Sequence, residues 1–169
     1  MHKIFFLIGS SGAGKTTVAE LIKEKNLPNF IVCRSDSVKV PSSKEMIKNY
    51  GSTEEWQKFN TIQWVKEIKE KYLENNNVLL DIQSRPSFID EACKNNNIEL
   101  YKTILFDCSD EERKRRLIKE RNQPHLANDQ MMDWARYLRE KCIQDNCYII
   151  DNTNITPTEN LSKLLEIIN

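Results

Sequence analysis

The chain has 169 residues, of which 39% are hydrophobic and 30% charged, and its 25 basic side chains balance its 25 acidic ones. This length suits one folded domain, residues 1–169, without room for a second. A balanced charge without basic blocks argues against binding of long nucleic acid or an anionic membrane through a general electrostatic field.

The longest apolar run covers residues 4–8, far below the ~20 residues that cross a bilayer, and we expect a cytoplasmic protein without a membrane partner. Five cysteines without a C-x-x-C pair favour reduced thiols over a disulfide framework or a zinc site.

Short apolar runs bounded by polar turns recur from one end of the chain to the other. They cover residues 4–8, 30–33, 78–82, 103–108 and 148–151. Runs of this length that are apolar on both faces are typical of buried parallel strands, and amphipathic helical patterns alternate with them. The alternation predicts an α/β fold with a five-stranded parallel sheet between two helical layers.

Helix starts are marked by a hydroxyl residue followed three positions later by Glu, which is the pattern of a capping box. Four pairs fit it: Ser42 with Glu45, Ser52 with Glu55, Ser109 with Glu112, and Thr156 with Glu159.

Two stretches exceed a simple connection between strand and helix. Residues 37–77 predict two or three helices, and residues 122–133 predict a polar loop between two helices. Insertions of this kind commonly carry binding or lid functions, whereas a plain spacer is the alternative. We interpret the first as an acceptor-binding insertion and the second as a lid loop.

A phosphate-binding motif follows the first predicted strand. Residues 9–16, GSSGAGKT, fit G-x-x-x-x-G-K-[ST] at every constrained position. The glycines let successive N–H groups line a concave nest for phosphate oxygens, and the following helix adds its positive N-terminal end. Lys15 is expected to bridge the β- and γ-phosphates, and Thr16 to bind Mg²⁺.

The motif predicts that the chain binds ATP, or another nucleoside triphosphate, together with Mg²⁺. The expected contacts of the loop are Gly9, Ser10, Ser11, Gly12, Ala13, Gly14, Lys15, Thr16 and Thr17.

This loop, together with the order of elements over the whole chain, resembles the small P-loop kinases, which include nucleoside monophosphate kinases and the kinase domain of polynucleotide kinases. The resemblance implies a three-layer P-loop fold that transfers the γ-phosphoryl group of ATP. It also implies roles for residues outside the loop.

At the end of the second strand, the resemblance places Asp36 toward the acceptor or Mg²⁺, and a helix N-cap is the alternative. Lys39 would pair with an acceptor phosphate. The segment LLDIQSRP, residues 79–86, looks like the third strand of nucleotide kinases, whose Asp holds Mg²⁺ through water and whose Arg grips the acceptor phosphate. Those positions are Asp81 and Arg85, although Ile82 stands where adenylate kinases carry Gly.

The resemblance further implies lid arginines that neutralise charge on the transferred group. Our candidates are Arg116 and Arg121, with solvent-exposed arginines as the alternative. These two are five residues apart and would not share a face of an α-helix, so they converge only if the helix ends near Arg121. Asn152 and Thr153, after the fifth strand, are expected near the adenine ring.

The predicted function is phosphoryl transfer from ATP-Mg²⁺ to a nucleotide-like or small hydroxylated acceptor. A polynucleotide 5′-hydroxyl end is a further acceptor, and an NTP-hydrolysing switch is the competing class. The guanine-reading pattern N-K-x-D of such switches is absent from the sequence. We interpret Trp56, Trp64 and Trp134 as packing residues rather than base-stacking platforms.

Overall fold

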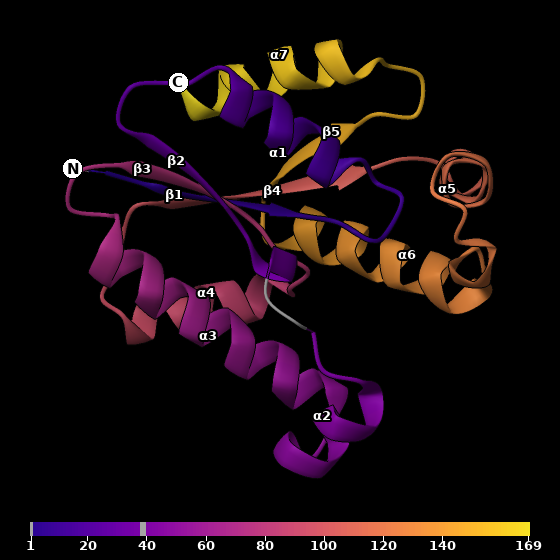
Figure 1. Ribbon diagram of the computed structural model, residues 1–169, viewed down its shortest axis with the longest axis horizontal. Helices are drawn as coiled ribbons and strands as arrows, with labels where there is room; N and C mark the ends of the chain where they lie inside the picture. The colour runs from indigo at the N-terminus through magenta and orange to yellow at the C-terminus, as the bar shows by residue number, and fades with distance from the viewer. Residues whose placement is uncertain (1, 38–39) are drawn as a thin grey trace.

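Five strands and seven α-helices alternate along the chain in the computed structural model, which describes residues 2–37 and 40–169 (Figure 1). The strands are β1 (Ile4–Ile8), β2 (Phe30–Arg34), β3 (Asn77–Asp81), β4 (Tyr101–Asp107) and β5 (Tyr148–Asp151). The α-helices are α1 (Lys15–Glu24), α2 (Ser43–Tyr50), α3 (Thr53–Lys71), α4 (Pro86–Asn95), α5 (Asp110–Arg115), α6 (Asp129–Gln144) and α7 (Pro157–Ile168). Three short turns of other helix types are η1 (Ser35–Ser37), η2 (Arg116–Glu120) and η3 (Pro124–Leu126).

The strands form one parallel sheet in the order β2-β3-β1-β4-β5. Helices α1 and α7 cover one face, and α3, α4 and α6 cover the other (Figure 1). Alternate residues of β1 supply both cores, because Phe5 and Leu7 face one helical layer while Ile4 and Phe6 face the other. The predicted fold class is confirmed.

The carboxyl ends of the strands gather several polar groups at one edge of the sheet. Asp81 at the end of β3 is in register with Leu7 of β1 and Arg34 of β2. Asp107 at the end of β4 is in register with Asp151 of β5. Ligands of open α/β sheets bind at this edge, so the topology positions the candidate site there.

Two of the four predicted capping boxes are complete. At Ser42 and Thr156, the hydroxyl accepts from the third helical N–H and the Glu side chain accepts from the cap residue's N–H. At Ser52 and Ser109, only the hydroxyl half forms. For Ser109 the reason is visible, because the Glu112 carboxylate pairs instead with two arginines described below.

The insertion at residues 37–77 contains two α-helices, α2 and α3. The predicted loop at 122–133 is shorter than expected, because the Asn128 side chain accepts from the Met131 N–H and α6 begins at Asp129. Lys39 lies outside the described residues. Within the described part of the chain, no helix is both long and apolar enough to span a membrane.

Candidate active site

The phosphate loop between β1 and α1 needs glycine at three positions. Gly9, Gly12 and Gly14 have φ values of 150°, 81° and 85°, where a side chain is strained. A Cβ on Gly9 would collide with the Phe106 carbonyl oxygen, and one on Gly12 would lie 3.1 Å from the Leu117 side chain. The loop is therefore packed closely against β4 and η2, which fixes its curvature.

At the end of the loop, Lys15 and Thr16 meet the carboxylate of Asp81. The Lys15 Nζ donates to the Gly9 carbonyl over 2.7 Å, and the Thr16 hydroxyl donates to Asp81 Oδ2 over 3.1 Å. Burial raises the pKa of Asp81, an effect that Lys15 and Thr16 oppose. Burial likewise lowers the pKa of Lys15, against the attraction of Asp81. Both charged forms are thus short of solvation in the free protein.

Such a site fits Mg²⁺ bound with a triphosphate. Mg²⁺ takes few protein oxygens and completes its shell with phosphate oxygens and water, so one hydroxyl and one carboxylate suffice. The buried, incompletely compensated carboxylate of Asp81 beside Thr16 supplies that donor pair. Among the described residues, no group of three or more His, Cys, Asp or Glu side chains could hold a metal by itself.

Asp36 lies in η1, directly after β2, with an exposed side chain that pairs with Arg34 over 3.2 Å. The helix that follows is capped by Ser42, so the alternative interpretation of Asp36 as its N-cap is wrong. The negative charge of Asp36 also acts on Asp81, since it adds to the effect of burial that raises the pKa of Asp81.

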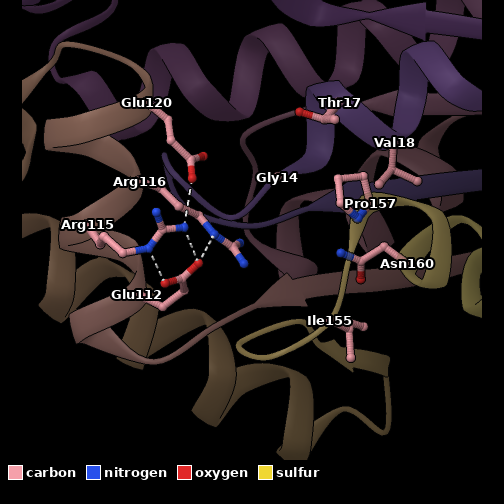
Figure 2. Close-up of a pocket in the computed structure, with 10 residues that line it drawn as sticks. All are labelled: Gly14, Thr17, Val18, Glu112, Arg115, Arg116, Glu120, Ile155, Pro157 and Asn160. Carbon is pink, nitrogen blue, oxygen red and sulfur yellow. Dashed lines mark hydrogen bonds and ion pairs between the residues drawn. The ribbon is translucent and has the colours of Figure 1, made fainter.

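A cavity of about 190 Å³ lies on the α1 and α7 side of the loop (Figure 2). Its lining consists of Gly14, Thr17, Val18, Glu112, Arg115, Arg116, Glu120, Ile155, Pro157 and Asn160. It joins the phosphate loop to the segment after β5, which is where the sequence places the adenine ring.

Arg116 connects this cavity to the loop. Its guanidinium donates to the Asn152 side-chain oxygen and to the Asn152 carbonyl, each over 2.8 Å. The Asn152 amide in turn donates to the Ala13 carbonyl over 2.7 Å. Asn152 is fully buried, so its side chain supports the loop from behind. Thr153 lies apart from the cavity lining, and its hydroxyl accepts from the Ser109 N–H and donates to Asp151.

Glu112 holds Arg116 in place. Its carboxylate accepts from Arg116 Nε over 2.7 Å and from two nitrogens of Arg115, as the dashed lines in Figure 2 show. Hydrogen bonds from Arg115, together with Arg116, lower the pKa of Glu112 to about 2. The carboxylate is therefore a fixed anion that orients both arginines over the cavity.

Arg116 and Arg121 both line a further cavity of about 240 Å³ over the phosphate loop. The sequence argument required the helix to end near Arg121; α5 ends at Arg115, and the π-helical turn that continues it ends at Glu120. The chain continues as a π-helical turn, with the Arg121 N–H donating to the Arg116 carbonyl over 3.0 Å. In a π-helical turn the hydrogen bonds join residues i and i+5, which brings residues five apart toward one side of the helix. The π-helical turn therefore brings Arg116 and Arg121 together.

Arg113 was not one of the two lid arginines chosen from the sequence, yet it is fully buried beside the loop. It donates to the Ser10 hydroxyl, to Asp107 Oδ1 over 2.8 Å and to the Cys108 carbonyl over 3.0 Å. Asp107 also pairs with Arg139 of α6 over 2.5 Å. The available signal was the spacing to Leu117, a core residue four positions on, which puts Arg113 on the inward face of its helix.

The largest described cavity, about 710 Å³, lies between η1, the α2–α3 insertion and the start of α6. We call it the acceptor cavity, after the acceptor-binding role that the sequence predicts for residues 37–77. Its lining includes Asp36 and Arg85, and both stretches singled out in the sequence contribute. Trp56 and Trp134 line it too, and both Trp64 and Trp134 pack against the core, so the packing interpretation fits Trp64 and Trp134 better than Trp56.

The guanidinium of Arg85 is already engaged. Nη1 donates to Gln57 Oε1 over 2.5 Å, and Nη2 contacts Glu54 Oε2 at 3.2 Å. Its Cζ also lies 5.0 Å from the centroid of the Trp134 ring and 5.5 Å from that of Tyr137. Arg85 thereby links α3 to α6 across the cavity wall.

Comparison with known proteins places the chain in a family. The family model described as AAA domain matches residues 6–135. The chain therefore belongs to the AAA domain family. No curated protein matches the chain by sequence.

Solved P-loop kinases share its fold. A shikimate kinase from Bacteroides thetaiotaomicron is 20% identical with a TM-score of 0.66, covering 98% of this chain and 97% of that one. APS kinase from Mycobacterium tuberculosis, in complex with AMPPNP and APS, is 15% identical with a TM-score of 0.62, covering 99% and 97%. A gluconokinase from Sinorhizobium meliloti 1021 is 14% identical with a TM-score of 0.65, covering 98% and 91%. The resemblance predicted from the sequence is confirmed for the fold.

Proposed function

We propose that this member of the AAA domain family is an ATP-dependent kinase that phosphorylates a small hydroxylated acceptor. One observation carries the proposal: Asp36 lines the acceptor cavity and pairs with Arg34, the residue of β2 that is in register with Asp81 of the phosphate site. A donor site and a second, larger cavity thus lie side by side at one edge of the sheet. This is the arrangement that group transfer between two substrates needs.

On the donor side, the backbone N–H groups of the loop bind the phosphates of ATP, and Lys15 exchanges the Gly9 carbonyl for phosphate oxygens. Thr16 and Asp81 would hold Mg²⁺, which when bound neutralises charge on the phosphates. Arg121 would approach the phosphates from the end of the π-helical turn, while Arg116, whose three guanidinium nitrogens already donate to Glu112 and Asn152, shapes the cavity wall beside Gly14. AMPPNP in the APS kinase complex supports ATP as the donor class.

On the acceptor side, we assign Asp36 the role of orienting the attacking hydroxyl and accepting its proton. The oxygen of that hydroxyl forms a bond to the γ-phosphorus as the bond to the leaving oxygen of ADP breaks. Residues 122–133 contribute Leu126, Asn128, Gln130 and Met131 to the cavity wall and act as the lid that excludes water, which would otherwise accept the phosphoryl group.

The test is a ³¹P NMR screen in which the protein, ATP and Mg²⁺ are incubated with single acceptors. We expect ADP and a phosphorylated acceptor to form faster than ADP forms in water alone. Lys15→Ala should abolish transfer while circular dichroism shows a folded chain, because Lys15 supplies charge to the phosphates and not core packing. Lys119→Ala, an exposed lysine of η2, is the matched control. Hydrolysis that no acceptor accelerates would instead favour a nucleotide switch.

A further inference from the structure

The residues that line the acceptor cavity indicate what it binds, whereas the phosphate site is common to many P-loop proteins. Flat rings line it on two sides: Trp56 from α3, and Trp134 and Tyr137 from α6. The Trp134 and Tyr137 rings stack at 5.4 Å with an interplanar angle of 14°. A volume of about 710 Å³ is ample for a ligand with its own flat ring system.

The described residues of the wall include more carboxylates than cations. Among the described lining residues, Arg85 is the single Lys or Arg, against the carboxylates of Asp36, Glu54 and Asp133. Each of these three carboxylates has an arginine partner: Arg34, Arg85 and Arg136, respectively. The described wall therefore offers no excess positive charge to an anionic acceptor.

Arg85 could serve an anion only by giving up contacts. A phosphate or carboxylate is best bound by two parallel N–H donors of the guanidinium. Both terminal nitrogens of Arg85 already contact Gln57 and Glu54, and rings flank its Cζ. The Arg85 side chain is 20% exposed. This geometry is that of a wall residue, contrary to the phosphate-gripping role that the sequence suggested.

Neutral hydrogen-bonding groups also line the wall, beside apolar side chains such as Met46 and Leu126. Amide side chains from three segments line it, namely Asn60 of α3, Gln83 after β3 and Gln130 in the first turn of α6. An amide offers both a donor and an acceptor, which matches the edge of a heterocyclic base or a sugar hydroxyl. Rings for stacking beside amides for edge recognition are the features by which proteins bind unpaired bases.

We infer that the acceptor is an uncharged alcohol carrying a flat heterocycle, the nucleoside class, and not a nucleotide or a sugar acid. The inference rests on the proposed kinase function. Atoms balance as in any kinase: the nucleoside hydroxyl oxygen bonds to the γ-phosphorus, its proton passes to Asp36 and then to solvent, and ADP leaves. The products are ADP and a nucleoside monophosphate.

The experiment compares matched acceptors with ATP-Mg²⁺. Each nucleoside is paired with its 5′-monophosphate, and glucose is paired with gluconate, with ADP and phosphorylated product measured by coupled assay and mass spectrometry. We expect at least one nucleoside to exceed its monophosphate and both sugars at least tenfold in kcat/KM. Preference for a monophosphate or gluconate, with nucleosides at the water background, would overturn the inference and leave the kinase standing. ADP formation at the water background for every acceptor, with ATP binding intact by calorimetry, would overturn both.

Protein variants test the wall directly. Trp56→Leu removes a ring that lies outside the packed core and should raise the nucleoside KM by roughly 5- to 150-fold, the range of base–aromatic stacking, with a smaller change in kcat. Trp56→Phe, the matched control, keeps a ring and should recover most of the loss. Equal KM values for the Leu and Phe variants would count against stacking.

Arg85→Met provides the second arm, read out by calorimetric binding of a nucleoside and of its monophosphate. If Arg85 only supports the cavity wall, Arg85→Met should change the affinities for the nucleoside and for its monophosphate by a similar factor. Selective loss of monophosphate binding, with nucleoside binding unchanged, would show that Arg85 grips phosphate and would refute the inference.

Discussion

Arg113→Met tests whether a buried ion pair holds the phosphate loop in its binding shape. Arg113 has no exposed surface and links the loop hydroxyl of Ser10 to the Asp107 carboxylate and the Cys108 carbonyl. Met preserves much of the side-chain length and removes the charge and all three hydrogen bonds. We expect a less stable protein that also binds ATP more weakly.

The magnitude follows from what the substitution leaves behind. Removing one partner of a buried pair costs about 3–5 kcal/mol, because the other charge stays buried without compensation. Arg139 still contacts Asp107, and the Nε of Arg113 has no partner to lose, so the lower end applies. About 3 kcal/mol corresponds to a fall in Tm of roughly 6–12 °C for a domain of this size.

Thermal unfolding by circular dichroism measures the stability, and calorimetric titration of ATP measures the effect on the loop. The matched control is Arg136→Met in α6, whose ion pair with Asp133 lies at the surface and whose loss should leave Tm nearly unchanged. For ATP we expect a loss of about tenfold in Arg113→Met, since about 1.4 kcal/mol of loop ordering corresponds to that factor.

The double variant Asp107→Asn/Arg113→Met separates charge from packing. If the uncompensated carboxylate causes the loss, neutralising it should make the double variant more stable than Arg113→Met alone. Two results would refute the reasoning. One is a decrease in Tm of less than about 2 °C for Arg113→Met, and the other is a double variant whose loss of stability equals the sum of the losses in the two single variants.

The remaining predictions concern the carboxylates. Asp36→Asn should lower kcat with little change in ATP affinity, whereas Asp81→Asn should raise the Mg²⁺ concentration needed for activity; normal kinetics for both would contradict the assigned roles. Burial raises the pKa of Asp81, so ionising this carboxyl destabilises the folded protein. The Tm of Asp81→Asn should therefore exceed that of the parent by a margin that grows as pH rises from about 4 and levels off above the raised pKa. A margin that does not depend on pH would be inconsistent with that shift. Hydrogen bonds from Arg115 lower the pKa of Glu112 to about 2, so Glu112→Gln should be least stable relative to the parent above about pH 5 and approach it as pH falls from about 4.5 toward 2; a gap that persists at pH 2 would point to packing instead.

Local sequence determined the fold class and the core of the donor site. The five strands lie within two residues of their predicted bounds, because runs such as residues 4–8 can be buried on both faces only inside a parallel sheet. The phosphate loop could also be predicted from local sequence. Gly9, Gly12 and Gly14 adopt positive φ angles that other residues avoid, so the spacing of the glycines indicates the conformation of the loop.

Other parts of the site could not be read from local sequence, because they depend on contacts between distant residues. Ser10 and Arg113 are 103 positions apart, and Arg116 and Asn152 are 36 apart, so no local pattern pairs them. The π-helical turn that brings Arg116 and Arg121 to one cavity is likewise not encoded by an α-helical spacing rule.

Arg85 shows the difference most clearly. Its position after β3 and its residue type suggested a phosphate ligand, and both are properties of the sequence alone. The folded chain engages its two terminal nitrogens with Gln57 and Glu54 of α3 and places its Cζ near the Trp134 ring of α6. Sequence determined which donors the site possesses, whereas tertiary packing decided which of them are already satisfied, since a donor that a protein group has claimed must give up that contact before it can serve a ligand.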